Sequence, residues 1–195
     1  MIIKLARTGM KGKSKDYLIL FSGLICSVSV FYMFLSLSTN RDFITNNSVI
    51  NSIQLVFWVG TALLSIITFF YILYAHSFLL TLRKREFGTY LLLGIKRKQI
   101  KQVAYYETTI IAVSSILIGI LSGLVLSYLV SLGITKQLDI ELVGFHPISL
   151  PAFLVTVVYF SLAFLVTSLW NSRKLSKTPI LELVHANVQT EEAPS

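Results

Sequence analysis

Histidine and cysteine are the residue types in this sequence most suited to a catalytic or metal site. His76, His146 and His185 are far apart, and the apolar stretches between them are expected to place them on different sides of a membrane, so they cannot share one metal ion. Cys26 is the single cysteine and lies in an apolar run, which excludes a disulfide within the chain and favours an inert buried thiol. No glycine-rich phosphate loop is present. The sequence therefore predicts neither a catalytic residue nor a metal site.

Glu107 is the acidic residue nearest to the interior of an apolar stretch. An ionisable group inside a membrane span is by default a candidate for a transport path. Glu107 and His76, however, both fall near the ends of such stretches. We therefore expect Glu107 to lie at the membrane interface, paired with a nearby lysine, rather than to carry protons.

The composition indicates the kind of protein that holds these residues. Hydrophobic residues make up 54% of the chain and charged residues 13%, against roughly 25% charged residues in soluble domains. A soluble fold of 195 residues could not bury that much apolar surface, so a bilayer must act as the apolar solvent. The net charge of +8 is spread in short runs between apolar stretches, which argues against a nucleic-acid partner.

Four apolar stretches reach the roughly 20 residues that are needed to span a hydrocarbon core. They are residues 17–37, about 56–80, about 110–132 and 150–170. The first is interpreted as a retained anchor, because its apolar core is too long for a cleaved signal peptide. We expect an all-α integral membrane protein with four transmembrane helices.

Lysine and arginine are distributed unevenly over the segments between these stretches. Fifteen of the seventeen lie before the first stretch, between the second and third, or after the fourth. The other two segments hold one each, Arg41 and Lys136. By the positive-inside rule, the asymmetry predicts a multi-pass protein of the cell membrane, with both termini and the middle segment in the cytoplasm.

The middle segment, residues 83–102, is the least ordinary part of the chain. No helix breaker separates the second apolar stretch from Leu93, so the helix is expected to continue out of the membrane. Gly94 suits a left-handed helix cap, with Ile95 as the apolar residue that often follows it. A second helix is expected to start over residues 96–101. The segment thus forms a helix–turn–helix, which we call the elbow.

Three apolar residues, Tyr90, Leu91 and Leu92, are expected near the tip of the elbow. Apolar side chains at an otherwise charged tip need a partner. Taken alone, these residues leave two partners open, the headgroups of membrane lipid and another protein.

The third apolar stretch carries a small residue at every fourth position. This helix-packing strip consists of Ser115, Gly119, Gly123 and Ser127. Residues four apart share one helix face, so a second helix can approach closely along it. The partner helix can belong to the same chain or to a second membrane subunit, and both alternatives stay open.

Two motifs resemble those of the FtsX-like ABC transporter permeases. In the elbow the motif reads Arg85-Glu86-x-Gly88-x-x-x-Leu92-Leu93-Gly94-x-Lys96-Arg97-x-Gln99-Ile100, and near the end of the chain Arg173-Lys174 is followed by Thr178-Pro179-Ile180-x-x-Leu183. The resemblance covers roughly residues 55–185. Within the family, the short first outer loop is similar to the N-terminal half of the BceB-type (bacitracin and lantibiotic resistance) permeases.

The residues and the resemblance together predict a division of the chain into four parts. Residues 1–16 are a basic cytoplasmic leader, and residues 17–52 hold the first transmembrane helix and a short outer loop. Residues 53–185 form the FtsX-like permease domain, and residues 186–195 are a polar tail. The resembling proteins are much longer, so a fragment, a split half and a complete small permease are all alternatives.

The resemblance also implies a function, the membrane subunit of an ABC transporter without enzymatic activity of its own. A separate cytoplasmic ABC ATPase dimer would bind ATP and magnesium and contact the elbow, while this chain would bind no cofactor. The residues carried over to this coupling role are Glu86, Gly88, Leu91, Leu92, Gly94, Lys96, Arg97 and Gln99. A second permease half or a further copy of the chain would complete the membrane part. Antimicrobial-peptide export or resistance, or the release of a lipid target, is the implied task.

Two other functions compete with this interpretation. One is a small regulatory or immunity protein that docks on a sensor histidine kinase or on a full-length permease. The other is a structural four-helix membrane protein, whose likeness to the family has no functional consequence.

Overall fold

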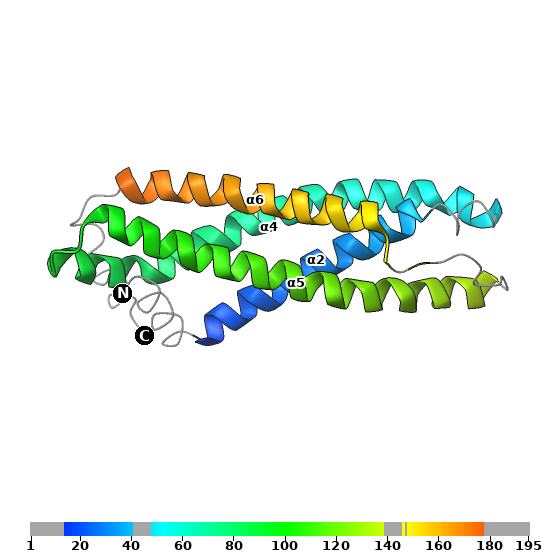
Figure 1. Ribbon diagram of the computed structural model, residues 1–195, viewed down its shortest axis with the longest axis horizontal. Coiled ribbons are helices and arrows are strands. Elements are labelled where there is room, and N and C mark those ends of the chain that lie inside the picture. The colour runs from blue at the N-terminus through cyan, green and yellow to red at the C-terminus, as the bar shows by residue number, and fades with distance from the viewer. Residues whose placement is uncertain (1–13, 41–47, 139–145, 147, 178–195) are drawn as a thin grey trace, which may run out of the picture. The chain divides into compact units, whose positions relative to one another are not determined.

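The computed structural model describes residues 14–40, 48–138, 146 and 148–177 (Figure 1). These residues form four α-helices and no strand: α2 (Ser14–Thr39), α4 (Ser48–Leu92), α5 (Arg97–Leu138) and α6 (Leu150–Lys177). The all-α fold predicted from the sequence is confirmed. The predicted polar tail, His185, the motif that begins at Thr178 and most of the basic leader lie outside the described residues.

Each helix contains a stretch that is long and apolar enough to cross a membrane. The stretches are Tyr17–Thr39, Gln54–Thr81, Lys98–Gln137 and Leu150–Trp170. The third is longer than predicted, with 40 residues, because the polar start of α5 runs into the apolar part without a helix breaker. At about 1.5 Å per residue it exceeds the roughly 30 Å of a hydrocarbon core, so part of α5 must extend beyond the membrane.

The described residues divide into two compact units. The first unit comprises the described parts of Met1–Leu20, Ile72–Ile111 and Phe164–Ser195, and it contains the elbow. The second unit comprises the described parts of Phe21–Tyr71 and Ala112–Ala163, and it contains the packing strip.

In the second unit the packing strip lies against α2. Its two serines are fully buried, and Gly119 and Gly123 are buried as well. A Cβ atom added to Gly119 would lie 2.5 Å from the Cβ of Val28, and one added to Gly123 would lie 3.1 Å from the Cβ of Tyr32. No larger side chain fits there without displacing α2. Of the two alternatives for the strip, the structure therefore shows packing within the chain.

Serine hydroxyl groups complete this helix contact. The hydroxyl of Ser29 on α2 donates a hydrogen bond to the Gly119 carbonyl at 3.1 Å and lies 2.6 Å from the hydroxyl of Ser122. Hydrogen bonds between helices in lipid hold small-residue contacts together where the hydrophobic effect cannot.

Candidate functional site

The turn of the elbow is closed by backbone hydrogen bonds of the Schellman type. Gly94 has a φ of +84°, in the left-handed region that favours glycine. Its N–H donates to the Leu91 carbonyl, and the N–H of Ile95 donates to the Tyr90 carbonyl, both at 3.0 Å. These bonds satisfy carbonyls that the end of α4 would otherwise leave unpaired. The predicted left-handed cap at Gly94, with Ile95 following it, is confirmed.

The start of α5 is capped by the side chain of Gln99. Its Oε1 accepts a hydrogen bond from the backbone N–H of Lys96 at 3.1 Å, while the N–H of Gln99 donates back to the Lys96 carbonyl at 2.8 Å. This is the reciprocal half of a capping box, in which a glutamine at the third helical position holds the residue before the helix. The structure thus gives Gln99, a residue predicted for coupling, a local role in fixing the turn.

Apolar packing holds the two helices of the elbow together. Phe87 on α4 and Ile100 on α5 are buried, with exposed fractions of 1% and 3%. The partly buried residues around them are Leu80, Tyr90, Leu91, Ile95 and Ala104. This elbow core fixes the direction in which the turn points.

The exposed apolar tip of the elbow consists of Leu92 and Leu93, which are 68% and 75% exposed. Tyr90 and Leu91, also expected near the tip, adjoin the turn but are partly buried, because both pack into the elbow core. They follow Phe87 by three and four residues, and residues at that spacing share one helix face. Leu92 and Leu93 fall on the opposite side.

The other residues predicted for coupling differ in their exposure. Lys96 and Gln99 are exposed, Gly88 is buried, and Glu86 is half-buried on the side of α4 that faces α5. Arg97 begins α5, but its side chain lies outside the described residues. The predicted set is therefore divided among the exposed tip, the turn, and buried or half-buried positions behind them.

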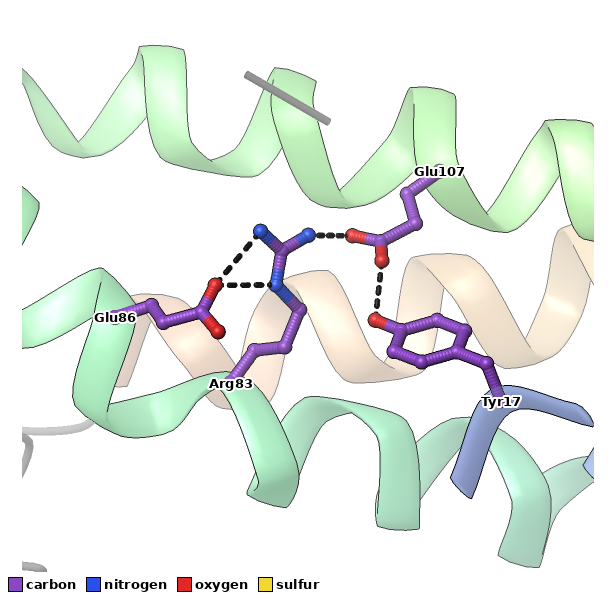
Figure 2. A network of polar contacts seen from close by, with 4 residues as sticks. All are labelled: Tyr17, Arg83, Glu86 and Glu107. Carbon is purple, nitrogen blue, oxygen red and sulfur yellow. Dashed lines mark hydrogen bonds and ion pairs between the residues drawn. The ribbon is translucent and has the colours of Figure 1, made fainter. Parts of the chain in front are cut away.

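A buried polar network lies at the base of the elbow (Figure 2). The Arg83 Nε donates a hydrogen bond to Glu86 Oε2 at 3.0 Å, Nη2 lies 2.9 Å from the same oxygen at ion-pair distance, and Nη1 pairs with Glu107 Oε2. The Tyr17 hydroxyl donates to the second oxygen of Glu107. Arg83, Glu107 and Tyr17 are 2%, 5% and 8% exposed. The network therefore joins α2, α4 and α5.

The expectation that Glu107 pairs with a lysine is wrong. Its partner is Arg83, from the helix on the other side of the elbow. An arginine suits this position better than a lysine does. Its planar guanidinium group can bond two carboxylates at once, whereas the lysine ammonium group is a point charge. Sequence reasoning missed Arg83; the spacing of Arg83 and Glu86 by three residues was the local signal that could have singled it out.

The charge on Arg83 is maintained by its partners. Burial lowers the pKa of the guanidinium, but the attraction of Glu107, and after it Tyr17 and Glu86, raises the pKa above its ordinary value. The guanidinium carbon also lies 5.3 Å from the centre of the Phe87 ring, within the range of a cation–π contact. Arg83 therefore carries a full positive charge that needs its two carboxylates.

A cavity of about 50 Å³ opens beside the network. Besides Tyr17, Arg83 and Glu107, its lining includes His76, Lys101 and Thr108. Its lining also includes Leu79, Leu80 and Phe87, so the cavity is mostly apolar with the polar network along one part of its wall. Among the residues described by the structure, no group of three or more His, Cys, Asp or Glu side chains could hold a metal ion.

Comparison with known families identifies the fold that carries the elbow. Residues 58–180 match the family described as FtsX-like permease C-terminal. The chain belongs to the FtsX-like permease family. With four helices able to span a membrane, it is a multi-pass membrane protein. The family resemblance inferred from the elbow motif is thereby confirmed.

Three relatives match almost the whole chain. An uncharacterized ABC transporter permease of Bacillus subtilis (strain 168), YvcS, is 29% identical over 196 residues, which cover 97% of this chain and 30% of the relative. The bacitracin export permease BceB of the same strain is 26% identical over 98% of this chain and 29% of its own length. BceB of Halalkalibacterium halodurans is 23% identical over 94% of this chain and 28% of its own length. The chain thus spans about three tenths of the length of these relatives.

Proposed function

We propose that this chain serves in the membrane part of an ABC transporter and that the elbow docks on a separate cytoplasmic ATPase. The observation that carries the proposal is the exposed pair Leu92–Leu93 at the end of a rigid turn. Two exposed leucines beside Lys96 and Gln99 are suited to bind a groove of a partner protein. The floor of that groove would be apolar and its rim polar. YvcS, which is described as an ABC transporter permease, supports the same partner.

The helices of the elbow suit it to transmit force. α4 runs unbroken from the span Gln54–Thr81 to Leu92, and α5 runs unbroken from Arg97 into its own span. The elbow core and the two caps fix the turn between them. Movement of a docked ATPase therefore acts directly on two membrane helices, without a flexible joint in the described elbow.

The elbow and its partner are proposed to lie in the cytoplasm. The positive-inside rule supports this position for the elbow and both termini, because the basic residues concentrate in those segments. ATP and magnesium belong to the ATPase dimer, so this chain contributes no catalytic group. A second permease half or a further copy completes the membrane part. Because two of the relatives are described as bacitracin export permeases, export of or resistance to a peptide antibiotic is the proposed task.

A pull-down tests the docking role. The tagged chain is expressed in a host that carries the matching ATPase genes, extracted in mild detergent and captured, and bound proteins are identified by mass spectrometry. The native chain is expected to retain an ABC ATPase, and Leu92→Asp and Leu93→Asp are expected to lose it. Gln102→Asp adds the same charge at an exposed site of the elbow away from the tip and serves as the matched control.

Two results would contradict the proposal. Equal recovery of the ATPase with the native chain and both leucine variants would remove the tip from the contact. Recovery of a sensor histidine kinase without any ATPase would favour the regulatory alternative instead.

A further inference from the structure

Within the first unit, α4 and α5 are connected through the turn at Gly94, but α2 is not part of that connection. The elbow core consists of residues of α4, the turn and α5, with none from the described part of α2. The Tyr17 hydroxyl instead reaches Glu107, 90 residues away in the sequence. The polar network therefore supplies a contact with α2 that the apolar elbow core does not.

Arg83 is placed between an accessible and an inaccessible carboxylate. Glu86 lies three residues closer to the tip, and its side chain is 29% exposed, whereas that of Glu107 is 6% exposed (Figure 2). A docked protein can compete for Glu86, but it cannot reach Glu107. A change in the contact between Glu86 and Arg83 therefore affects the buried pair of Arg83 and Glu107, because both carboxylates bind the same guanidinium group.

The buried ion pair and its hydrogen bond to Tyr17 resist separation. A buried charge that loses its partner is strongly destabilising. When Arg83 moves, Glu107 must follow or lose its compensation, and the Tyr17 hydroxyl must follow Glu107. The adjacent cavity provides space for this movement.

We propose that Arg83, Glu107 and Tyr17 form a transmission link that passes movement of the elbow to α2, with Glu86 as its accessible end. The inference rests on the proposed docking of the elbow and assigns it a route to the first span. These residues are positioning residues, since they act through one another.

The link can be tested on the full chain in lipid nanodiscs without an ATPase. An environment-sensitive fluorophore is attached to Leu18→Cys, an exposed site next to Tyr17. Cys26 is replaced by serine, because the structure has it exposed and not buried as the sequence led us to expect. Glu86→Gln is expected to shift the emission of this probe. The same substitution is expected to cause no shift when Tyr17→Phe is also present, because the contact with α2 is then missing. Gln102→Asp is the control for a change on the elbow outside the network.

A second background separates transmission from mere stability. The triple variant Arg83→Met, Glu107→Leu and Tyr17→Phe replaces the network by apolar groups, and it is expected to keep the thermal stability of the native chain but to lose the response to Glu86→Gln. An equal shift in the native and Tyr17→Phe backgrounds, or no shift in the native network, would overturn the link.

A further arm tests the link together with the ATPase. If the native chain recovers an ATPase, trapping that complex with ATP and vanadate is expected to shift the Leu18 probe, and Tyr17→Phe is expected to abolish the shift while the ATPase still co-purifies. A persistent shift in Tyr17→Phe would contradict the link but leave the docking role intact. If the native chain recovers no ATPase, the proposed function fails, and the nanodisc experiment still decides the link.

Discussion

Arg83 and Glu107, 24 residues apart on opposite sides of the elbow, form a buried ion pair between α4 and α5. Each has a further partner, Glu86 for Arg83 and Tyr17 for Glu107. A buried pair of this kind is costly to break from one side, since the remaining charge then lacks compensation.

The first prediction follows from this pair. Glu107→Gln removes the carboxylate but leaves Arg83 buried, and it is expected to destabilise the protein by about 3–5 kcal/mol. Replacing both residues at once, as Arg83→Met with Glu107→Leu, is expected to cost far less, because no buried charge remains. The fraction of folded protein that survives heating in detergent, measured by fluorescence-detected size exclusion, compares them. An equal loss of folded protein for the single and the double variant would show that Arg83 and Glu107 do not stabilise each other.

The second prediction concerns the positive φ of Gly94. A Cβ atom added at Gly94 or at Gly133 meets no other atom within 4 Å, so the two sites differ in backbone conformation rather than in space. Gly94→Ala is expected to destabilise the elbow by about 1–2 kcal/mol. Gly133→Ala lies inside α5 and is expected to be neutral or to stabilise by up to about 1 kcal/mol. The same heating assay applies, and similar values for both variants would argue against strain at the turn.

The third prediction tests the contact between the packing strip and α2. Gly119→Leu and Gly123→Leu are expected to destabilise the chain, because their side chains would collide with Val28 and with Tyr32. Val125→Leu adds bulk at an exposed position of the same helix and is the control. The yield of monodisperse protein after extraction is the measurement. Normal yields for both glycine variants would place the strip against lipid.

The fourth prediction concerns orientation. In a Cys26→Ser background, cysteines at Gln137 and Ile148, both exposed, are expected to react with a membrane-impermeant thiol reagent in intact cells. A cysteine at Thr89, an exposed site on the elbow, is expected to react only after lysis. Labelling of Thr89 in intact cells would overturn the cytoplasmic position of the elbow.

Those features of the chain that depend on local sequence were predictable. The four spans follow from runs of apolar residues, and the cap follows from a glycine between an apolar helix end and a basic helix start. The left-handed φ of Gly94 and the position of Ile95 agree with that prediction. Here the physical cause lies within a few residues of its effect.

The features that depend on long-range helix register were not predictable. Tyr17 and Glu107 are in contact although 90 residues separate them in the sequence. The rotation of α4 relative to α5 turns Tyr90 and Leu91 inward and leaves Leu92 and Leu93 exposed. The sequence pattern likewise left open whether the packing strip meets a helix of its own chain. Each of these outcomes depends on how the helices are rotated about their axes, which hydropathy alone does not specify.

The separation of the elbow core from its tip has a consequence for partner choice over evolutionary time. Phe87 and Ile100 hold the elbow together, whereas Leu92 and Leu93 take no part in that packing. Substitutions at the two leucines are therefore nearly free of folding cost, and the proposed docking surface can change while the membrane scaffold stays the same. Under the docking proposal, two chains that differ only at these positions are expected to bind different ATPases.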